Sequence, residues 1–133
     1  LEAAVATADV VSAATMSNTP LIHGDWLKPG THVDLVGGYT PTMREADDVA
    51  IQRASVFVDT RAGALKEAGD VTQPLASGVL TAEAIRGELA ELCAGRVAGR
   101  TSVAEITLFK SIGMAMSDLV GAGLVYKTVS GGA

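Results

Sequence analysis

Residues 106–113 have the sequence ITLFKSIG, and this stretch decides the fold more clearly than any other. Ile106 to Phe109 form a short, nearly continuous apolar run, which is typical of a strand buried on both faces of a sheet. Lys110 to Gly113 are mostly polar or small and predict a loop directly after the strand. We therefore expect a core strand whose carboxyl end places Lys110 and Ser111 at one edge of the sheet.

Three runs of the same kind precede this stretch, with helical or turn-like sequence between them. They cover Val10 to Ala14, His32 to Val36 and Val56 to Asp59. Strands at this spacing are joined by right-handed crossovers and pair in parallel. Only 4% of the residues are aromatic while 48% are hydrophobic, which favours helices packed on a buried parallel sheet. The predicted class is α/β, in one compact unit.

Two helices are predicted in the second half of the chain. Thr81 to Ala94 has a capping threonine, an apolar stripe and Gly95 as a stop signal. A last helix is expected to begin at Ser111 as its cap and to lead into a loose tail at Gly131-Gly132.

Composition excludes several classes of function. The formal net charge is -5 and the ten Lys and Arg residues are scattered, so nucleic acid is not an expected partner. Cys93 is the only cysteine, which excludes an internal disulfide and fits a cytoplasmic location. His23 and His32 have no ligands at metal-binding spacing. Gly113 to Tyr126 is apolar but too short to span a membrane, and no signal peptide is expected.

The loops that follow the strands are the expected ligand site, because ligands bind at the carboxyl ends of parallel strands. Gly37-Gly38 follows the second strand and allows a close backbone approach, although an ordinary turn explains it equally. Asp47 and Asp48 suit either a helix start or an acid/base group. Lys110 is a candidate catalytic amine, positioning group or phosphate contact, and Ser111 a simple cap.

No Gly-x-Gly-x-x-Gly motif follows a strand at the start of the chain, so a complete dinucleotide-binding domain is not expected. The pattern fits the second mononucleotide half of such a domain, or a generic α/β domain. The first residues, Leu1 to Val5, include no initiator Met and no capping residue. We expect the chain to be the interior of a longer polypeptide.

A series of short motifs resembles the ornithine cyclodeaminase/mu-crystallin family, in order and from about Ala8 to Tyr126. The motifs are Ala14-Thr15-x-Ser17-x-x-Pro20, Lys28-Pro29-Gly30-Thr31-His32-Val33, Gly37-Gly38, Arg44-Glu45-x-Asp47, Val56-Phe57-Val58-Asp59, Glu67-Ala68-Gly69-Asp70, Gly87-Glu88-Leu89 and Glu105-Ile106-Thr107-Leu108-Phe109-Lys110-Ser111-Ile112-Gly113. Each motif is weak alone, and the joint match is specific.

This resemblance implies a Rossmann-type domain that binds NAD or NADP. Residues 1–112 would be its second half, and residues 113–133 a C-terminal helix and tail towards a dimerisation domain, with the N-terminal half of the protein absent. The full-length form would be a homodimer acting on a small amino or imino acid, and the fragment alone inactive. The residues implied to line the dinucleotide are Ala14, Thr15, Ser17, Val36, Gly37, Lys110, Ser111 and Gly113.

The implied chemistry is hydride exchange at the α-carbon of an amino acid. It would either convert ornithine to proline and ammonia or reduce a cyclic ketimine such as pyrroline-2-carboxylate. Asp47 matches the family position proposed to assist proton transfer, with Ala46 in place of the usual leucine and Asp48 as a second candidate. Cyclodeaminases carry a differently spaced acid, at Val49 here, which argues against ornithine cyclisation.

Two other classes of function remain open. Crystallin-type members imply that the same fold can serve as a non-catalytic NAD(P)H-binding or ligand-binding protein. A Rossmann-like interaction module without a cofactor is the third class.

Overall fold

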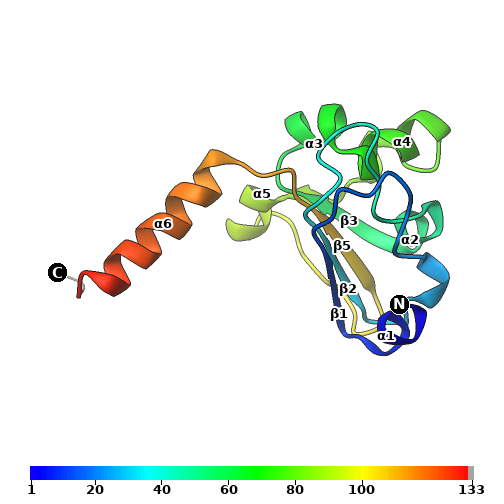
Figure 1. Ribbon diagram of the computed structural model, residues 1–133, viewed down its shortest axis with the longest axis horizontal. Helices are drawn as coiled ribbons and strands as arrows, with labels where there is room; N and C mark the ends of the chain where they lie inside the picture. Colours follow the sequence, from blue (N-terminus) through cyan, green and yellow to red (C-terminus); the bar gives the residue numbers. More distant parts are fainter. Residues whose placement is uncertain (132–133) are drawn as a thin grey trace.

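A five-stranded parallel sheet forms the centre of the computed structural model, which describes residues 1–131 (Figure 1). The strand order is β1-β2-β5-β3-β4, and every neighbouring pair is parallel. The strands are β1 (Val10–Ala13), β2 (His32–Leu35), β3 (Ala54–Val58), β4 (Gly87–Glu88) and β5 (Ile106–Lys110). The predicted α/β class and the four predicted strands are confirmed. The apolar run at Ile106 to Phe109 lies in the central strand, β5.

Helices α2, α3 and α4 lie on one side of the sheet (Figure 1). The core on this side includes Val33, Leu35, Val58 and Leu108, all with no exposed surface. Because burying each such side chain stabilises the fold by roughly 1.5 to 3 kcal/mol, this layer holds the strands in register. The helical elements are α1 (Glu2–Thr7), η1 (Gly24–Trp26), α2 (Asp48–Arg53), α3 (Arg61–Glu67), α4 (Gly69–Ser77), η2 (Ala82–Ala84), α5 (Leu89–Cys93) and α6 (Ala115–Val129).

The other face of the sheet is partly open, and this corrects the prediction that every strand is buried on both faces. In β1 and β2 buried residues alternate with exposed or half-buried ones. Val10, for example, is 62% exposed. This face carries a groove of about 560 Å³ between the strands and α5, lined by Val10, His32, Phe57, Leu89, Leu92, Gly99, Arg100, Thr107 and Phe109. Helices cover one face more completely than the other, so the strand pattern is mixed.

The predicted helix from Thr81 to Ala94 is wrong. The Thr81 hydroxyl does accept a hydrogen bond from the Ala84 amide, but the turn it caps is only η2. The chain then extends, and Gly87 and Glu88 pair with β3 as strand β4. A new capping box at Glu88 and Glu91 starts the short helix α5. The tertiary pairing with β3 outweighs the helical periodicity, which explains why Ile85 is buried without a continuous helix.

The last helix begins at Ala115 rather than after Ser111. Gly113 has a φ of +88°, a left-handed conformation that interrupts a helix, and Ser111 is engaged elsewhere, as described below. Helix α6 has no buried residue and extends away from the sheet (Figure 1). The expected tail at Gly132 lies outside the described residues. In the described part of the chain, no helix is both long and apolar enough to cross a membrane.

Candidate functional site

The carboxyl ends of β1, β2 and β5 meet at one edge of the sheet. Thr15 follows β1, Gly37 follows β2 and Lys110 ends β5. Parallel pairing puts Ala13 opposite Leu35 and Leu35 opposite Lys110, so three loops predicted from the sequence start side by side. We call this region the carboxyl edge. It is where open parallel sheets bind ligands.

The Gly37-Gly38 turn is tightly enclosed at this edge. A Cβ atom added to Gly37 would overlap the backbone of Thr15 and the carboxylate of Glu45. Gly38 has a φ of +57°, and a Cβ atom there would overlap the Asp70 carboxylate. The Gly38 carbonyl also accepts a hydrogen bond of 3.2 Å from the Gly69 amide. Both positions therefore require glycine, for space at Gly37 and for space and backbone conformation at Gly38.

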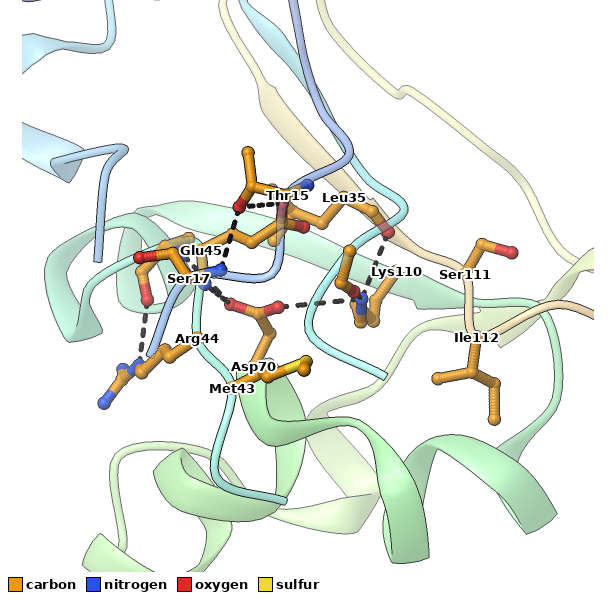
Figure 2. A network of polar contacts seen from close by, with 12 residues as sticks. Thr15, Ser17, Leu35, Met43, Arg44, Glu45, Asp70, Lys110, Ser111 and Ile112 are labelled. Atoms are coloured by element: carbon orange, nitrogen blue, oxygen red, sulfur yellow. Dashed lines mark hydrogen bonds and ion pairs between the residues drawn. The ribbon is translucent and has the colours of Figure 1, made fainter. Parts of the chain in front are cut away.

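Lys110 has no exposed surface, and its ammonium lies beneath the carboxyl edge (Figure 2). Nζ donates to the carbonyls of Gly37 and Leu35, the latter at 3.4 Å. It also lies 3.6 Å from Oδ2 of Asp70. Burial lowers the pKa of Lys110, while the charges of Asp70 and Glu45 oppose that change. Lys110 is therefore not solvated, and in this arrangement its ammonium does not face a site where it could contact a phosphate directly.

Asp70 connects Lys110 to the segment before α2. Its Oδ1 accepts hydrogen bonds from the amides of Glu45 at 2.7 Å and Ala46 at 2.9 Å. Burial raises the pKa of Asp70, and the two amide donors and Lys110 act in the opposite direction. Glu45 in turn accepts from the Thr15 amide at 2.6 Å and the Thr15 hydroxyl at 2.8 Å (Figure 2).

We call these five residues the carboxyl-edge network: Thr15, Gly37, Glu45, Asp70 and Lys110. Glu45, Asp70 and Lys110 have no exposed surface. Oε2 of Glu45 and Oδ2 of Asp70 are buried without a hydrogen-bond donor among the described residues. The network therefore holds two carboxylates and one ammonium out of water, which is unusual in a structural core.

A third buried carboxylate, Asp59, shapes the loop after β5. Its Oδ2 accepts from the amides of Ile112 at 2.8 Å and Gly113 at 3.0 Å, and from the Ser111 hydroxyl at 3.1 Å. Asp59 is only 2% exposed. Ser111 and Gly113 are thus held by a residue at the end of β3, which is why Ser111 does not cap a helix.

Asp47 lies at the start of α2 and caps it. Its Oδ1 accepts from the Ala50 amide at 2.8 Å and the Gly24 amide at 2.9 Å. Its Oδ2 lies 3.0 Å from Nδ1 of His23. The neighbouring Asp48 pairs with Arg44. Both carboxylate oxygens of Asp47 are engaged, so the observed geometry is that of a helix cap.

The remaining predicted contacts lie on the surface of the same edge. Ala14 is exposed and Val36 is 46% exposed. The Ser17 hydroxyl donates to the Thr19 carbonyl at 2.6 Å, and the Ser17 carbonyl accepts from the Arg44 amide at 2.7 Å. These residues line the outer surface of the loops that the network holds from below.

Sequence reasoning missed the roles of Glu45, Asp70 and Asp59. Each appeared in a quoted motif, but an acidic residue near a helix start is usually explained by the helix dipole. A usable signal was present at Asp59, because it directly follows an apolar strand that is buried. Among residues 1–131, no group of three or more His, Cys, Asp or Glu side chains is placed to hold a metal ion.

Comparison with known proteins identifies the family. The profile of the Ornithine cyclodeaminase/mu-crystallin family matches residues 1–133. The chain belongs to this family. The resemblance predicted from the motifs is confirmed.

Two curated relatives and one solved structure illustrate the similarity. The chain is 46% identical to Delta(1)-pyrroline-2-carboxylate reductase of Paracoccus denitrificans, over 98% of this chain and 42% of that protein. It is 42% identical to ketimine reductase mu-crystallin of Mus musculus, over 99% of this chain and 39% of that protein. The structure of Thermococcus litoralis Delta(1)-pyrroline-2-carboxylate reductase with NADH and L-proline matches with a TM-score of 0.89 and 37% identity, over 95% of this chain and 39% of that one.

The chain thus spans about two fifths of the length of these relatives. The matched structure contains NADH, and its TM-score of 0.89 over 95% of this chain shows the same fold. A Rossmann-type α/β fold is therefore established for this part of the protein.

Proposed function

We propose that the protein containing this chain is an NAD(P)-dependent reductase of cyclic ketimines, which reduces a substrate such as pyrroline-2-carboxylate to the amino acid. The observation that carries the proposal is the carboxyl edge of a family-matched parallel sheet, with its enclosed glycine turn and buried network. The reductase names of the relatives support reduction over ornithine cyclisation.

The residues at the carboxyl edge fit one side of a nicotinamide dinucleotide. Ala14 and Val36 present small or apolar surface, and a Cβ atom at Gly113 would have nothing within 4 Å. Flat ligands need this kind of close backbone approach. We infer that Ala14, Thr15, Ser17, Val36, Gly37, Ser111 and Gly113 line the cofactor directly, and that Lys110 acts from beneath through Gly37.

A bound reduced nicotinamide would supply a hydride, which together with one proton converts the C=N bond of the ketimine to an amine. The chain's own contribution is to hold the cofactor loops in place and to exclude water from the edge. Asp47 remains our candidate for the proton-transfer group, with Asp48 second. Because Asp47 already caps α2, this role requires that it exchange the His23 or amide contacts for the substrate.

The experiment is an assay of the full-length protein. Absorbance of NADH and of NADPH is followed with pyrroline-2-carboxylate, and proline and ammonia are measured from ornithine plus NAD. Oxidation of the reduced cofactor with formation of proline supports the reductase. Ammonia and proline from ornithine would establish a cyclodeaminase instead, and no turnover with either substrate class would contradict the proposal.

A second candidate is a ligand-binding protein that holds NAD(P)H without turnover. Both Asp47 oxygens are engaged, Oδ1 by the Ala50 and Gly24 amides and Oδ2 by His23, and Asp48 pairs with Arg44. These contacts favour the second candidate, because neither acid of the predicted pair is free in the described residues. NADH binding without turnover, unchanged by Asp47→Asn, would select this candidate.

We further propose that the full-length protein is a homodimer and that residues 113–133 lead towards its pairing domain. The apolar residues exposed on α6 support this: Leu119, Val120, Leu124, Val125 and Tyr126 are each at least 63% exposed. Alone, the chain is expected to be inactive, since it spans about two fifths of the relatives' length.

A further inference from the structure

We propose that Asp70 and Lys110 are positioning residues, whose buried ion pair fixes the Gly37 carbonyl and so sets the shape of the turn from Val36 to Gly38 for cofactor binding. The inference rests on the proposed function and deepens it. Neither side chain is exposed, so any effect on a ligand must pass through the backbone segments that the pair holds.

Lys110 contacts the turn directly. Nζ donates to the Gly37 carbonyl and, at 3.4 Å, to the Leu35 carbonyl. These carbonyls belong to the last residue of β2 and to the turn itself. A buried ammonium that bridges the carbonyl at the end of β2 and a carbonyl of the turn restricts this backbone more than a single peptide hydrogen bond does.

The turn itself is enclosed and has no room to adapt. Gly37 lies against Thr15 and Glu45, and Gly38 lies against the Asp70 carboxylate. A displacement of Lys110 or Asp70 therefore moves the turn, because tightly packed neighbours transmit small shifts.

The same ion pair also reaches a second loop, the one after β1. Asp70 holds the amides of Glu45 and Ala46, and Glu45 holds the amide and hydroxyl of Thr15 (Figure 2). The Asp70–Lys110 pair thus holds the loops after β1 and β2, and we propose that both loops line the cofactor.

The buried charges of the network are not balanced. The buried network holds two carboxylates and one ammonium, of which only Asp70 pairs with Lys110, at 3.6 Å, and one oxygen of each carboxylate has no hydrogen-bond donor among the described residues. An apolar core of the same volume would be at least as stable in general. Buried charges without full pairing are unusual in a protein core, and here they lie at the edge where parallel sheets bind ligands. Positioning of the turn from Val36 to Gly38 explains them better than a contribution to stability does.

The test uses the full-length protein and two variants, Asp70→Asn and Lys110→Met. Asp70→Asn is the sharper one, because the amide oxygen can still accept from Glu45 and Ala46 while an NH₂ group replaces the oxygen that faces Lys110. We expect hydrogen exchange of the amides of residues 36–39, measured without cofactor, to accelerate about tenfold. If the binding-competent turn is correspondingly depopulated, the Kd for NADH rises about tenfold.

The kinetic signature separates positioning from loss of stability. We expect KM for NADH to rise with Kd, while kcat at saturating NADH and KM for the ketimine change less than about threefold. The matched control is Glu105→Gln at the opposite end of β5, which removes a carboxylate that bonds Ser55 and Thr101. It is expected to lower Tm without changing the exchange of residues 36–39 or the Kd for NADH. If Lys110→Met fails to fold, Asp70→Asn and the double variant provide the same readouts.

Two outcomes overturn the inference in distinguishable ways. Wild-type protein that binds neither NADH nor NADPH overturns the proposed function together with this inference. Wild-type protein that binds NADH, with both variants showing the same Kd and the same exchange of residues 36–39 at a lowered Tm, overturns only the positioning role.

Discussion

The charged groups at the two ends of β5 lie in opposite environments, one accessible and one buried. At the amino end, the Glu105 carboxylate accepts hydrogen bonds from the Ser55 hydroxyl at 2.5 Å, the Thr101 hydroxyl at 2.8 Å and the Thr101 amide. These neutral donors, with Ser55 the largest contributor, lower the pKa of Glu105 to about 2. At the carboxyl end, Lys110 and two carboxylates are sealed from water, and burial raises the pKa of Asp70.

This difference distinguishes a purely structural contact at the amino end of β5 from a candidate binding site at its carboxyl end. Neutral donors around an accessible carboxylate hold a strand end in place and create no unbalanced charge. Buried charges with unpaired oxygens depart from the pattern of a stable core, and such departures concentrate where a protein acts. Four predictions test or sharpen this comparison.

The largest expected effect is that of Lys110→Met. It leaves Glu45 and Asp70 buried without a cation, so we expect a loss of about 3 to 5 kcal/mol in the free energy of unfolding. Burial already raises the pKa of Asp70, and without the cation this pKa would lie further above that of the unfolded chain, so the loss is full at high pH and shrinks as pH falls. Urea unfolding at pH 8 and pH 5 measures this, with the exposed Lys66→Met as control. An equal loss at both pH values would contradict the explanation.

Asp59→Ala is expected to come second. It removes the acceptor for three groups of the loop after β5, namely Ser111, Ile112 and Gly113. Leaving partly buried donors without an acceptor should lower the free energy of unfolding by about 2 to 3 kcal/mol. Denaturant unfolding gives the value, and Asp59→Asn, which keeps one acceptor oxygen, should recover part of it. Identical losses for the two variants would count against the hydrogen bonds as the cause.

Asp47→Ala tests whether the Asp47 carboxylate has a catalytic role or only caps α2. Loss of the α2 cap should destabilise the fold by about 1 kcal/mol. Asp47→Ser keeps a capping group and should restore stability. If Asp47 also transfers a proton, the serine variant of the full-length protein stays inactive with a ketimine although its Tm is restored. Activity that returns together with Tm would assign Asp47 to capping alone.

Glu105→Gln is expected to have the smallest effect, and its signature is the dependence on pH. The pKa of Glu105 is lowered from 4.5 to about 2 in the folded protein, so its carboxylate stabilises the fold above pH 4.5. That contribution is lost as the pH falls towards 2. Tm of the variant should therefore lie below that of the wild type at pH 7, and the two should converge between these pH values. A constant difference across the range would refute the assignment.

Much of this fold follows from the sequence by ordinary reasoning. The apolar run at Ile106 to Phe109 predicts a core strand, and the parallel class follows from the spacing of four such runs. The region from Thr81 to Ala94 did not follow, because its periodicity suits a helix and its pairing with β3 depends on residues far away in the sequence. The late start of α6 escaped prediction for the same reason, since Asp59 binds Ser111 from 52 positions away.

The candidate site divides in a similar way. Thr15, Gly37, Lys110 and Ser111 were placed at one edge by the rule for parallel strands, and the structure brings them there. That Lys110 points inwards, and that Glu45 and Asp70 surround it, depends on packing between distant segments. Local sequence carries no signal for such burial.

The position of β5 also has a consequence for how the chain folds. It is the last of the five strands in sequence and the middle one in space, between β2 and β3, and His32 pairs with Thr107 across 75 positions. During synthesis β2 and β3 therefore each have one unpaired edge until β5 has been made and has paired with both. Closing such distant pairs is slow, and open edges of this kind attract other chains. The order of synthesis thus makes the sheet most prone to aggregation just before its central strand is in place.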